Sequence, residues 1–248
     1  MPPRYDSGTR YQLSFGGPLT PAVKSLIIVN VAIYVIELLL SGAVGPDAWD
    51  FTLTWFALNP VLVLRNLFVW QLVTYMFLHS LTSVFHILFN MLALWMFGGE
   101  IERAWGATRF VRYYLLCGMG GAVLNCAFAF QSQTVGASGA IFGLFVAYGM
   151  IFPTRTILFW GIFPMTARQL AILLSFIELV SIGAFAPDGV ARFAHLGGAL
   201  TGYIILKGFW NPRRLIDDLR WRIRRRRFKT IDRQDSRRDD KDRFYPFH

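Results

Sequence analysis

Charge is scarce in this chain. Only 16% of its 248 residues are charged and 54% are hydrophobic, whereas a typical soluble domain carries about 25% charged residues. Cysteine is scarce too: Cys117 and Cys126 lie nine residues apart in one apolar segment, which a helix would separate by about 13 Å along its axis. That distance excludes a disulfide between them. The composition therefore predicts a protein that crosses a membrane several times.

Several catalytic patterns are also missing. The sequence has no His-Glu-x-x-His, the pattern that gives zinc proteases two ligands and a base. The acids well inside hydrophobic segments are Glu37 and Glu178, and they belong to segments far apart in the chain rather than to an aspartyl pair. We expect Glu178 to pair with a polar group inside the bundle. We expect no metal, no cofactor and no nucleic-acid partner.

Long hydrophobic runs are what the sequence has in abundance. Six of them are predicted to be helices that span the membrane: 22–41, 81–98, 111–130, 137–152, 169–185 and 191–209. The fourth would be about 24 Å long, against about 30 Å for the hydrocarbon core, so one of its ends must lie inside the membrane. We expect interfacial amphipathic turns over 42–66, a charged turn over 99–109 and a loop over 153–168. The predicted fold is an all-α, polytopic six-helix bundle with a short fourth helix.

Basic residues mark one side of this bundle. From Lys207 onward the chain holds 15 of its 25 Lys and Arg but 7 of its 15 Asp and Glu, a net charge of +8. Arginines also fill the connections after the second and fourth segments: Arg103, Arg109, Arg112, Arg155 and Arg168. Since such loops stay in the cytoplasm, both termini are predicted to be cytoplasmic. The predicted parts are a cytoplasmic segment 1–18, a six-span core 19–211 and a basic tail 212–248 that binds anionic lipid headgroups.

A serine lies among small residues at the outer end of the short fourth segment. The stretch reads Gly136-Ala137-Ser138-Gly139-Ala140-Ile141-Phe142-Gly143. Serine can act as a nucleophile once a base removes its proton, so Ser138 is the candidate nucleophile. Small residues four apart also serve close packing of membrane helices, and the octapeptide alone fits that role as well.

Histidine is the usual base for a serine. Of the four histidines, His79, His86 and His195 fall near the predicted outer side, and His195 lies just inside the outer end of the sixth segment. A histidine there could face the headgroups, but ionisable residues inside membranes are usually functional. We therefore expect His195 to be the base for Ser138.

Glycines favour a close approach of the fourth and sixth segments. Gly198 and Gly202 share the helical face of His195, and Gly139 and Gly143 line the fourth segment. Two such faces could bring the serine and the histidine within hydrogen-bond reach. The supporting small residues are Gly136, Gly139, Gly143, Gly198 and Gly202.

A histidine and an asparagine share one face of the second segment. His86 and Asn90 are four residues apart, and both can donate hydrogen bonds. Acyl transfer needs donors placed where the oxyanion forms, which these side chains and the Ser138 N–H at a helix start could supply. Alone, Asn90 would more often bond across helices.

These motifs together resemble the rhomboid family of intramembrane serine proteases. The shared motifs, over roughly residues 20–210, are Gly136-x-Ser138-Gly139, Ala194-His195 with its glycines, His86-x-x-x-Asn90, and Glu102-x-x-x-Gly106 with Phe110. The resemblance implies cleavage of single-span membrane proteins by a dyad with no third acidic member. Ser138 would attack, His195 would be the base, and His86, Asn90 and the Ser138 amide would surround the oxyanion.

The chain departs from the family pattern at two places. Trp70-Gln71 stands where many relatives have Trp-Arg, so any role of that arginine is absent. The interval from His79 to His86 is about two residues longer than in familiar members, and we assign His79 no catalytic part. Neither departure touches Ser138 or His195.

Other functions remain alternatives. A catalytically inactive rhomboid-like protein could bind client transmembrane helices, and a triad through Asp188 is possible. A transporter would often show internal repeats, which the sequence lacks. We expect an integral, multi-pass protein of the plasma (inner) membrane of a bacterium.

Overall fold

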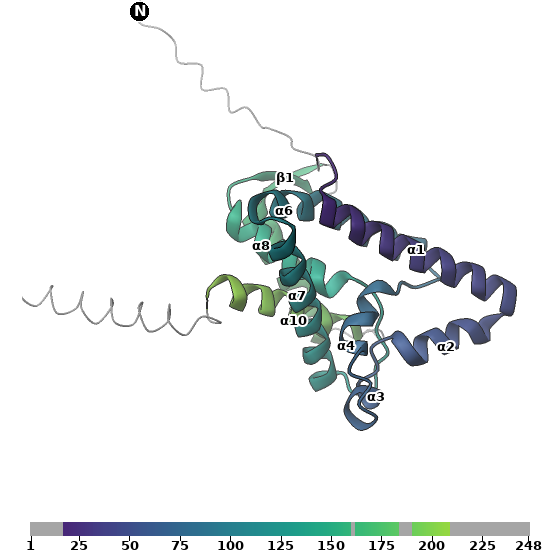
Figure 1. The fold of residues 1–248 in the computed structure, drawn as a ribbon. Helices are drawn as coiled ribbons and strands as arrows, with labels where there is room; N and C mark the ends of the chain where they lie inside the picture. Colours follow the sequence, from purple (N-terminus) through teal and green to yellow (C-terminus); the bar gives the residue numbers. More distant parts are fainter. Residues whose placement is uncertain (1–16, 160–161, 184–189, 209–248) are drawn as a thin grey trace, which may run out of the picture. The chain divides into compact units, whose positions relative to one another are not determined.

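The computed structural model describes residues 17–159, 162–183 and 190–208, and it divides into the units Met1–Tyr203 and Ile204–His248. The predicted tail and most of the predicted N-terminal segment lie outside the described residues. The element order places a helix in each of the six predicted hydrophobic segments, and Figure 1 shows their arrangement. They are α1 (Pro21–Val44), the continuous α5 (Val84–Ala93), π-turn η2 (Leu94–Gly98) and α6 (Gly99–Trp105), α7 (Ala107–Phe128), α8 (Ser138–Ile151), α9 (Ala167–Gly183) and α10 (Val190–Leu206).

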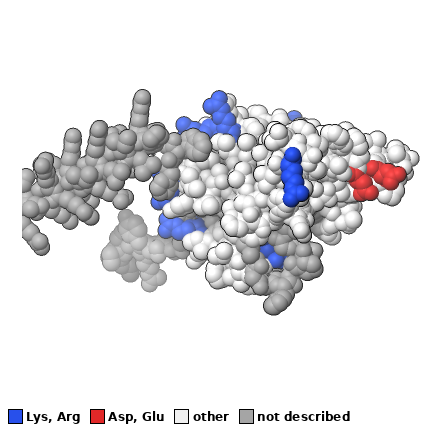
Figure 2. All heavy atoms as spheres, turned by 90° about the horizontal axis from the view of Figure 1, so that it is seen from below, with Lys and Arg blue, Asp and Glu red and all other residues white. Residues whose placement is uncertain are grey.

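The described helices differ in whether their length and hydrophobicity would let them cross a membrane. Only Pro21–Val44 and Val84–Trp105 are long and apolar enough by length and composition, while α8 is apolar but has 14 residues. Figure 2 shows a face that is largely uncharged, with its visible acids together at one end. The exposed acids among the described residues are Asp47 and Asp50, both in α2 (Pro46–Phe56). Two described helices are thus long and apolar enough to cross a membrane, and the fourth predicted helix is short, as expected.

Short helices build the connection after α1. Besides α2 they are α3 (Pro60–Arg65), α4 (Gln71–Thr74) and the 3-10 turn η1 (Tyr75–Phe77), and α2 exposes Phe51, Trp55 and Phe56 as an interfacial segment would. Gln71 is fully buried, and its amide accepts from the Asn59 N–H at 3.0 Å and donates to the Thr54 carbonyl at 2.9 Å. The residue that replaces the family arginine thus joins two backbone segments of this connection.

The charged turn predicted over 99–109 is wrong. Helix α6 continues to Trp105 and ends where Gly106 adopts φ +81°. Glu102 is buried and turned toward the start of α1, where it accepts from the Thr20 hydroxyl and from the N–H groups of Ala22 and Val23, both at 2.9 Å. The first N–H groups of a helix have no intrahelical acceptor, so a carboxylate from another helix supplies one.

The connection after α8 is a hairpin rather than a loop. Strands β1 (Thr156–Phe159) and β2 (Phe163–Thr166) pair antiparallel, with Thr156 opposite Thr166. The segment follows a helix-ending proline and is rich in threonine and large apolar residues, which favour strands. The described part of the chain is therefore mostly helical with one hairpin, rather than all-α. Arg155, just before β1, pairs with Glu100 of α6 at 3.1 Å, which places this connection beside the end of the α5–α6 helix.

Glycines let α8 and α10 touch backbone to backbone. A Cβ built on Gly198 would lie 1.8 Å from the Gly139 carbonyl oxygen, and one on Gly202 would lie 3.2 Å from the Gly143 Cα. Neither approach leaves room for a larger residue. The predicted close approach of these two faces is confirmed, and it fixes the neighbourhood of Ser138 and His195.

Candidate active site

Ser138 is the first residue of α8. Gly136, two residues earlier, has φ +121°, a conformation that side chains rarely adopt, and its N–H donates to the Tyr75 carbonyl at 2.9 Å. The chain thus turns sharply out of the preceding loop and enters a helix whose other members are largely buried. As a first-turn residue Ser138 has a backbone N–H without an intrahelical acceptor, at the positive end of the helix dipole.

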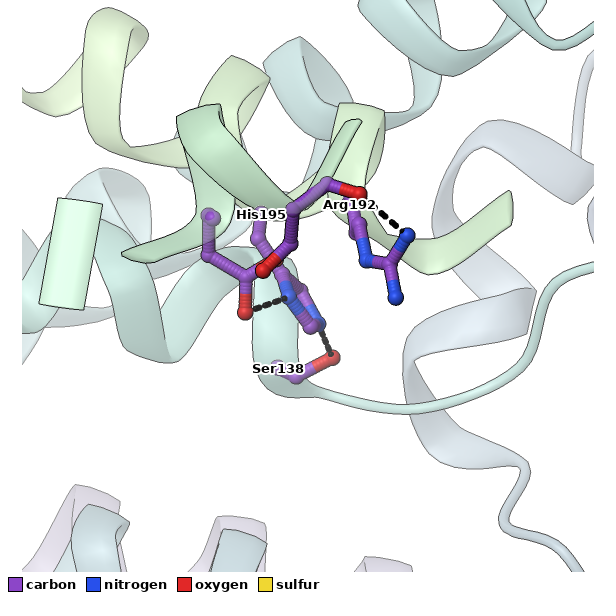
Figure 3. A network of polar contacts seen from close by, with 5 residues as sticks. Ser138, Arg192 and His195 are labelled. Carbon is purple, nitrogen blue, oxygen red and sulfur yellow. Dashed lines mark hydrogen bonds and ion pairs between the residues drawn. The ribbon is translucent and has the colours of Figure 1, made fainter. Parts of the chain in front are cut away.

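The hydroxyl of Ser138 and the imidazole of His195 are in contact. Ser138 Oγ lies 2.6 Å from His195 Nε2, as Figure 3 shows for these two labelled side chains from α8 and α10. For a base, Nε2 must accept the serine proton, which requires the ring hydrogen on Nδ1. The contact expected from the two glycine-lined helices is present.

Phe142 holds the imidazole from one side. Its ring stacks on the His195 ring with centroids 4.5 Å apart and planes 8° from parallel. The sequence argument missed this residue, although Phe142 is four residues after Ser138 and so shares its helical face. A flat ring stacked on the imidazole limits rotation of His195 away from the serine.

A carboxylate lies behind the imidazole. Glu178 Oε1, from α9, is 3.0 Å from His195 Nδ1, and both side chains are more than four-fifths buried. The approach is close but off the N–H axis, since Nδ1 has no hydrogen bond of good geometry among the described residues. The polar partner expected for Glu178 is therefore His195 itself, so an acid lies beside the pair for which the family resemblance implies no third acidic member. The sequence signal was a lone acid in an otherwise apolar helix.

His86 presents a donor toward the serine. Its Nδ1 accepts from the Ser80 N–H at 3.3 Å, so the neutral ring carries its hydrogen on Nε2. A Cβ built on Gly136 would lie 2.7 Å from that Nε2 and 3.7 Å from Ser138 Oγ. The glycine therefore leaves a small space that borders both the histidine donor and the serine oxygen.

Asn90 is turned along its own helix. Its side chain is buried, and Nδ2 donates to the His86 carbonyl one turn earlier at 2.6 Å. This bond uses one of the two amide hydrogens. In this structure Asn90 therefore supports the turn that carries His86, and the oxyanion role predicted for it stays a prediction.

His79 is buried beside this cluster without belonging to it. Its ring lies edge-on to the His86 ring at 5.2 Å, and neither ring nitrogen makes a hydrogen bond of good geometry within the described residues. Burial in this loop lowers the pKa of His79 to about 4; the neighbouring His86 adds to the shift, and a backbone carbonyl at Phe77 opposes it. The ring is therefore neutral at physiological pH and packs against a candidate oxyanion donor.

The polar loop 131–134 is more closed than expected. Its uncharged polar residues suggest a path for water to Ser138, but Ser132 and Thr134 are buried, and Asn125 Nδ2 donates to Ser132 Oγ at 2.9 Å. Asp188, the alternative third member, lies outside the described residues. No three His, Cys, Asp or Glu side chains of the described part are grouped to hold a metal ion.

Known proteins with similar sequences belong to one family. The family model of the rhomboid domain matches residues 66–211. RHOMBOID-like protein 2 of Arabidopsis thaliana is 37% identical over 136 residues, covering 55% of this chain and 41% of its own. RHOMBOID-like protein 1 of the same plant is 30% identical over 210 residues, covering 74% and 51%. Rhomboid protease GluP of Bacillus subtilis is 30% identical over 145 residues, covering 58% and 27%.

The chain spans about half the length, or less, of these curated relatives. The matched region begins before α4 and includes α5 to α10, so it contains every residue of the cluster around Ser138. The chain therefore belongs to the rhomboid family.

Proposed function

We propose that this protein is an intramembrane serine endopeptidase that cleaves single-span membrane proteins in or near their transmembrane segments. The observation that carries the proposal is the 2.6 Å contact between Ser138 Oγ and His195 Nε2 at the start of a short buried helix. The relative from Bacillus subtilis is named a protease, which supports the same reaction class. The proposed catalytic residues are Ser138 and His195.

Acylation follows from this geometry. Ser138 Oγ attacks the scissile carbonyl carbon while its proton passes to His195 Nε2, and the carbonyl oxygen becomes an oxyanion. The His86 Nε2–H, which borders the same small space as Ser138 Oγ, and the Ser138 N–H are proposed to bind that charge, with Asn90 as a further donor. When the intermediate collapses, the leaving amine takes the proton from Nε2 and the acyl group stays on Ser138.

Deacylation returns the enzyme to its starting state. His195 Nε2 takes a proton from a water molecule, whose oxygen attacks the acyl carbon. The second intermediate collapses with return of the proton to Ser138 Oγ, and the new carboxyl terminus leaves.

The proposed orientation has six crossings with both termini in the cytoplasm of a bacterium and Ser138 toward the outer side. It is supported by the contacts of Glu102 with the start of α1 and of Glu100 with Arg155, which gather the arginine-bearing connections at one end. The relatives include mitochondrial as well as bacterial proteins, so the comparison supports membrane location in general. The basic tail is proposed to bind anionic lipids.

Reconstitution with a tagged single-span protein tests the proposal. Wild type is expected to release a product, Ser138→Ala none, and His195→Ala at least about 10³-fold less. Ser25→Ala is the matched control, because Ser25 lies exposed on α1 and bonds only the Pro21 carbonyl one turn earlier. Release of product by wild type, Ser138→Ala and His195→Ala alike would overturn the assignment of Ser138 and His195 as catalytic residues. Substrate binding without cleavage by wild type would favour the inactive, client-binding alternative.

A further inference from the structure

The carboxylate of Glu178 lies where it can act on His195. Its Oε1 is 3.0 Å from Nδ1, the ring nitrogen opposite the one that contacts Ser138. The base function of Nε2 requires the hydrogen on Nδ1, on the side of Glu178. A carboxylate there favours that tautomer and the imidazolium that forms when the serine proton arrives.

A second contact holds the helix of Glu178 against the helix of His195. Arg192, one turn before His195 on α10, donates to the carbonyl of Ser181, nearly one turn after Glu178 on α9 (Figure 3). The two contacts run between the same pair of helices, within one turn of each other. The placement of Glu178 behind the imidazole is therefore fixed by the backbone of α9 and not only by a side-chain rotamer.

We propose that Glu178 is a positioning residue of this protease, which selects the Nδ1–H tautomer of His195 and stabilises its imidazolium. The inference rests on the proposed function. It makes the working unit three residues from three helices, Ser138 on α8, His195 on α10 and Glu178 on α9. In proton balance, the serine proton moves to Nε2 and back, while the Nδ1 hydrogen stays on the ring and Glu178 remains a carboxylate.

Other groups around the imidazole do not supply this role. His86 approaches from α5 but is itself a neutral imidazole whose hydrogen faces the serine, and Phe142 of α8 offers only a ring face. The Tyr75 hydroxyl lies near the backbone of Ala194, the residue before His195, but it donates to the Gly118 carbonyl at 2.8 Å. The guanidinium of Arg192 is bound to a carbonyl on α9. Among the described residues, Glu178 is the acid in contact with His195.

The test compares Glu178→Gln and Glu178→Asp with wild type in the reconstituted cleavage assay. Gln keeps the size but loses the charge, so kcat is expected to fall by about 10–100-fold with KM unchanged. The pH at which the rate falls on the acid side is expected to move lower, because the negative charge that favours the imidazolium is gone. Asp, which keeps the charge on a shorter side chain, is expected to recover part of kcat.

Two further measurements separate positioning from mere folding. The rate of labelling of Ser138 by a small fluorophosphonate should fall with kcat in Glu178→Gln, because that reaction needs an activated serine but no docked substrate helix. Glu37→Gln, which removes the other acid buried in an apolar helix, should leave kcat, labelling and the acid-side midpoint unchanged.

The outcomes are distinct. If kcat, the labelling rate and the acid-side midpoint of Glu178→Gln all equal those of wild type, this inference is overturned. The assignment of Ser138 and His195 as catalytic residues would still stand. A loss of kcat with an unchanged acid-side midpoint and no recovery in Glu178→Asp would also overturn it, since it would indicate a structural role. Absence of cleavage by wild type would instead overturn the proposed function.

Discussion

At the scale of single residues, the cluster around Ser138 depends on which nitrogen of each imidazole carries a hydrogen. In the proposed reaction His195 accepts on Nε2, whereas His86 donates from Nε2. The structure assigns the two rings differently through their neighbours: a carboxylate lies beside Nδ1 of His195, and a backbone N–H donates to Nδ1 of His86. Two residues of one type therefore take opposite roles because their other nitrogens have different partners.

Replacement of His86 tests its donor role. His86→Ala is expected to lower kcat by about 10²–10³-fold with little change in KM, because a hydrogen bond made mainly in the transition state is lost. The cleavage assay with titrated substrate measures both constants. His79→Phe is the matched control: it keeps a ring against the same neighbour and should cleave at the wild-type rate. Equal loss in both variants would show that only packing in this region matters.

The pH dependence of stability should report on His79. Its pKa falls from 6.5 to about 4 on folding, so between these values the unfolded chain binds a proton that the folded protein does not. Stability from this group is therefore present above pH 6.5 and lost as pH falls toward 4. The contribution of His79 to this loss should reach about 2.5 kcal/mol between pH 7.5 and 4.5, so the loss should be smaller by that amount in His79→Phe. Thermal unfolding in detergent at the two pH values measures it, and equal pH slopes for both proteins would contradict it.

At the scale of elements, the contact of α8 with α10 controls the site. The two helices meet through glycine backbones, and the serine and the histidine lie at the same end of that contact. Any residue that forces the helices apart must also lengthen the distance between Ser138 Oγ and His195 Nε2. Stability and activity are therefore coupled at this seam.

Gly198→Ala tests that coupling. The added Cβ would lie 1.8 Å from the Gly139 carbonyl oxygen, and backbone cannot rotate away as a side chain can. We expect a loss of about 3 kcal/mol or more together with a loss of cleavage. Gly42→Ala is the control, since a Cβ there in helix α1 meets no atom within 4 Å and alanine favours helix. Unfolding midpoint and cleavage rate are measured for both, and wild-type values in Gly198→Ala would refute the role of the seam.

At the scale of the whole molecule, the first helix has few attachments. Only 11% of the most apolar stretch of α1 is buried in the described structure. The start of α1 is nevertheless held by Glu102 of α6, which accepts three hydrogen bonds there. This carboxylate therefore joins the first and second hydrophobic helices. Glu102 belongs to the Glu102-x-x-x-Gly106 motif that resembles the family pattern, and in the structure it is the acceptor that holds the start of α1.

Loss of that carboxylate should loosen α1. Glu102→Ala leaves two backbone N–H groups and a hydroxyl without their acceptor, which should cost about 3–5 kcal/mol and lower Tm by roughly 10 °C. Thr20→Val removes one donor only and should cost about 1 kcal/mol. Thermal unfolding in one detergent compares them, and equal Tm values for the two variants would contradict a carboxylate shared by three donors.

The sequence could predict what local periodicity determines. Ser138, His195 and the glycines fall at helical spacing on apolar segments, so their faces, and hence their contact, could be inferred. Helix α8 begins and ends within a residue of the predicted bounds. Gln71 was recognised as a departure, but its two backbone partners at Asn59 and Thr54 were not predictable because they depend on a tertiary loop path.

What was missed depends on contacts between segments. Glu178 could have faced any neighbour of α9, and only the packing of α9 on α10 turns it to His195. Glu102 finds its acceptor role with residues about 80 positions earlier in the chain, which no local pattern encodes. The hairpin at Thr156–Phe159 and Phe163–Thr166 had a local signal in its strand-favouring residues, but the proline before it suggested only a loop.

The link between Glu102 and the start of α1 has a consequence for biosynthesis. The N-terminal helix leaves the ribosome long before the residue that completes it, so during that interval its exposed amide hydrogens must be satisfied by water or by lipid headgroups. Packing of the continuous α5–α6 helix against α1 then replaces those temporary partners with the Glu102 carboxylate. Truncated chains that stop before position 102 should accordingly present a first helix whose N-terminal amide groups have no protein acceptor.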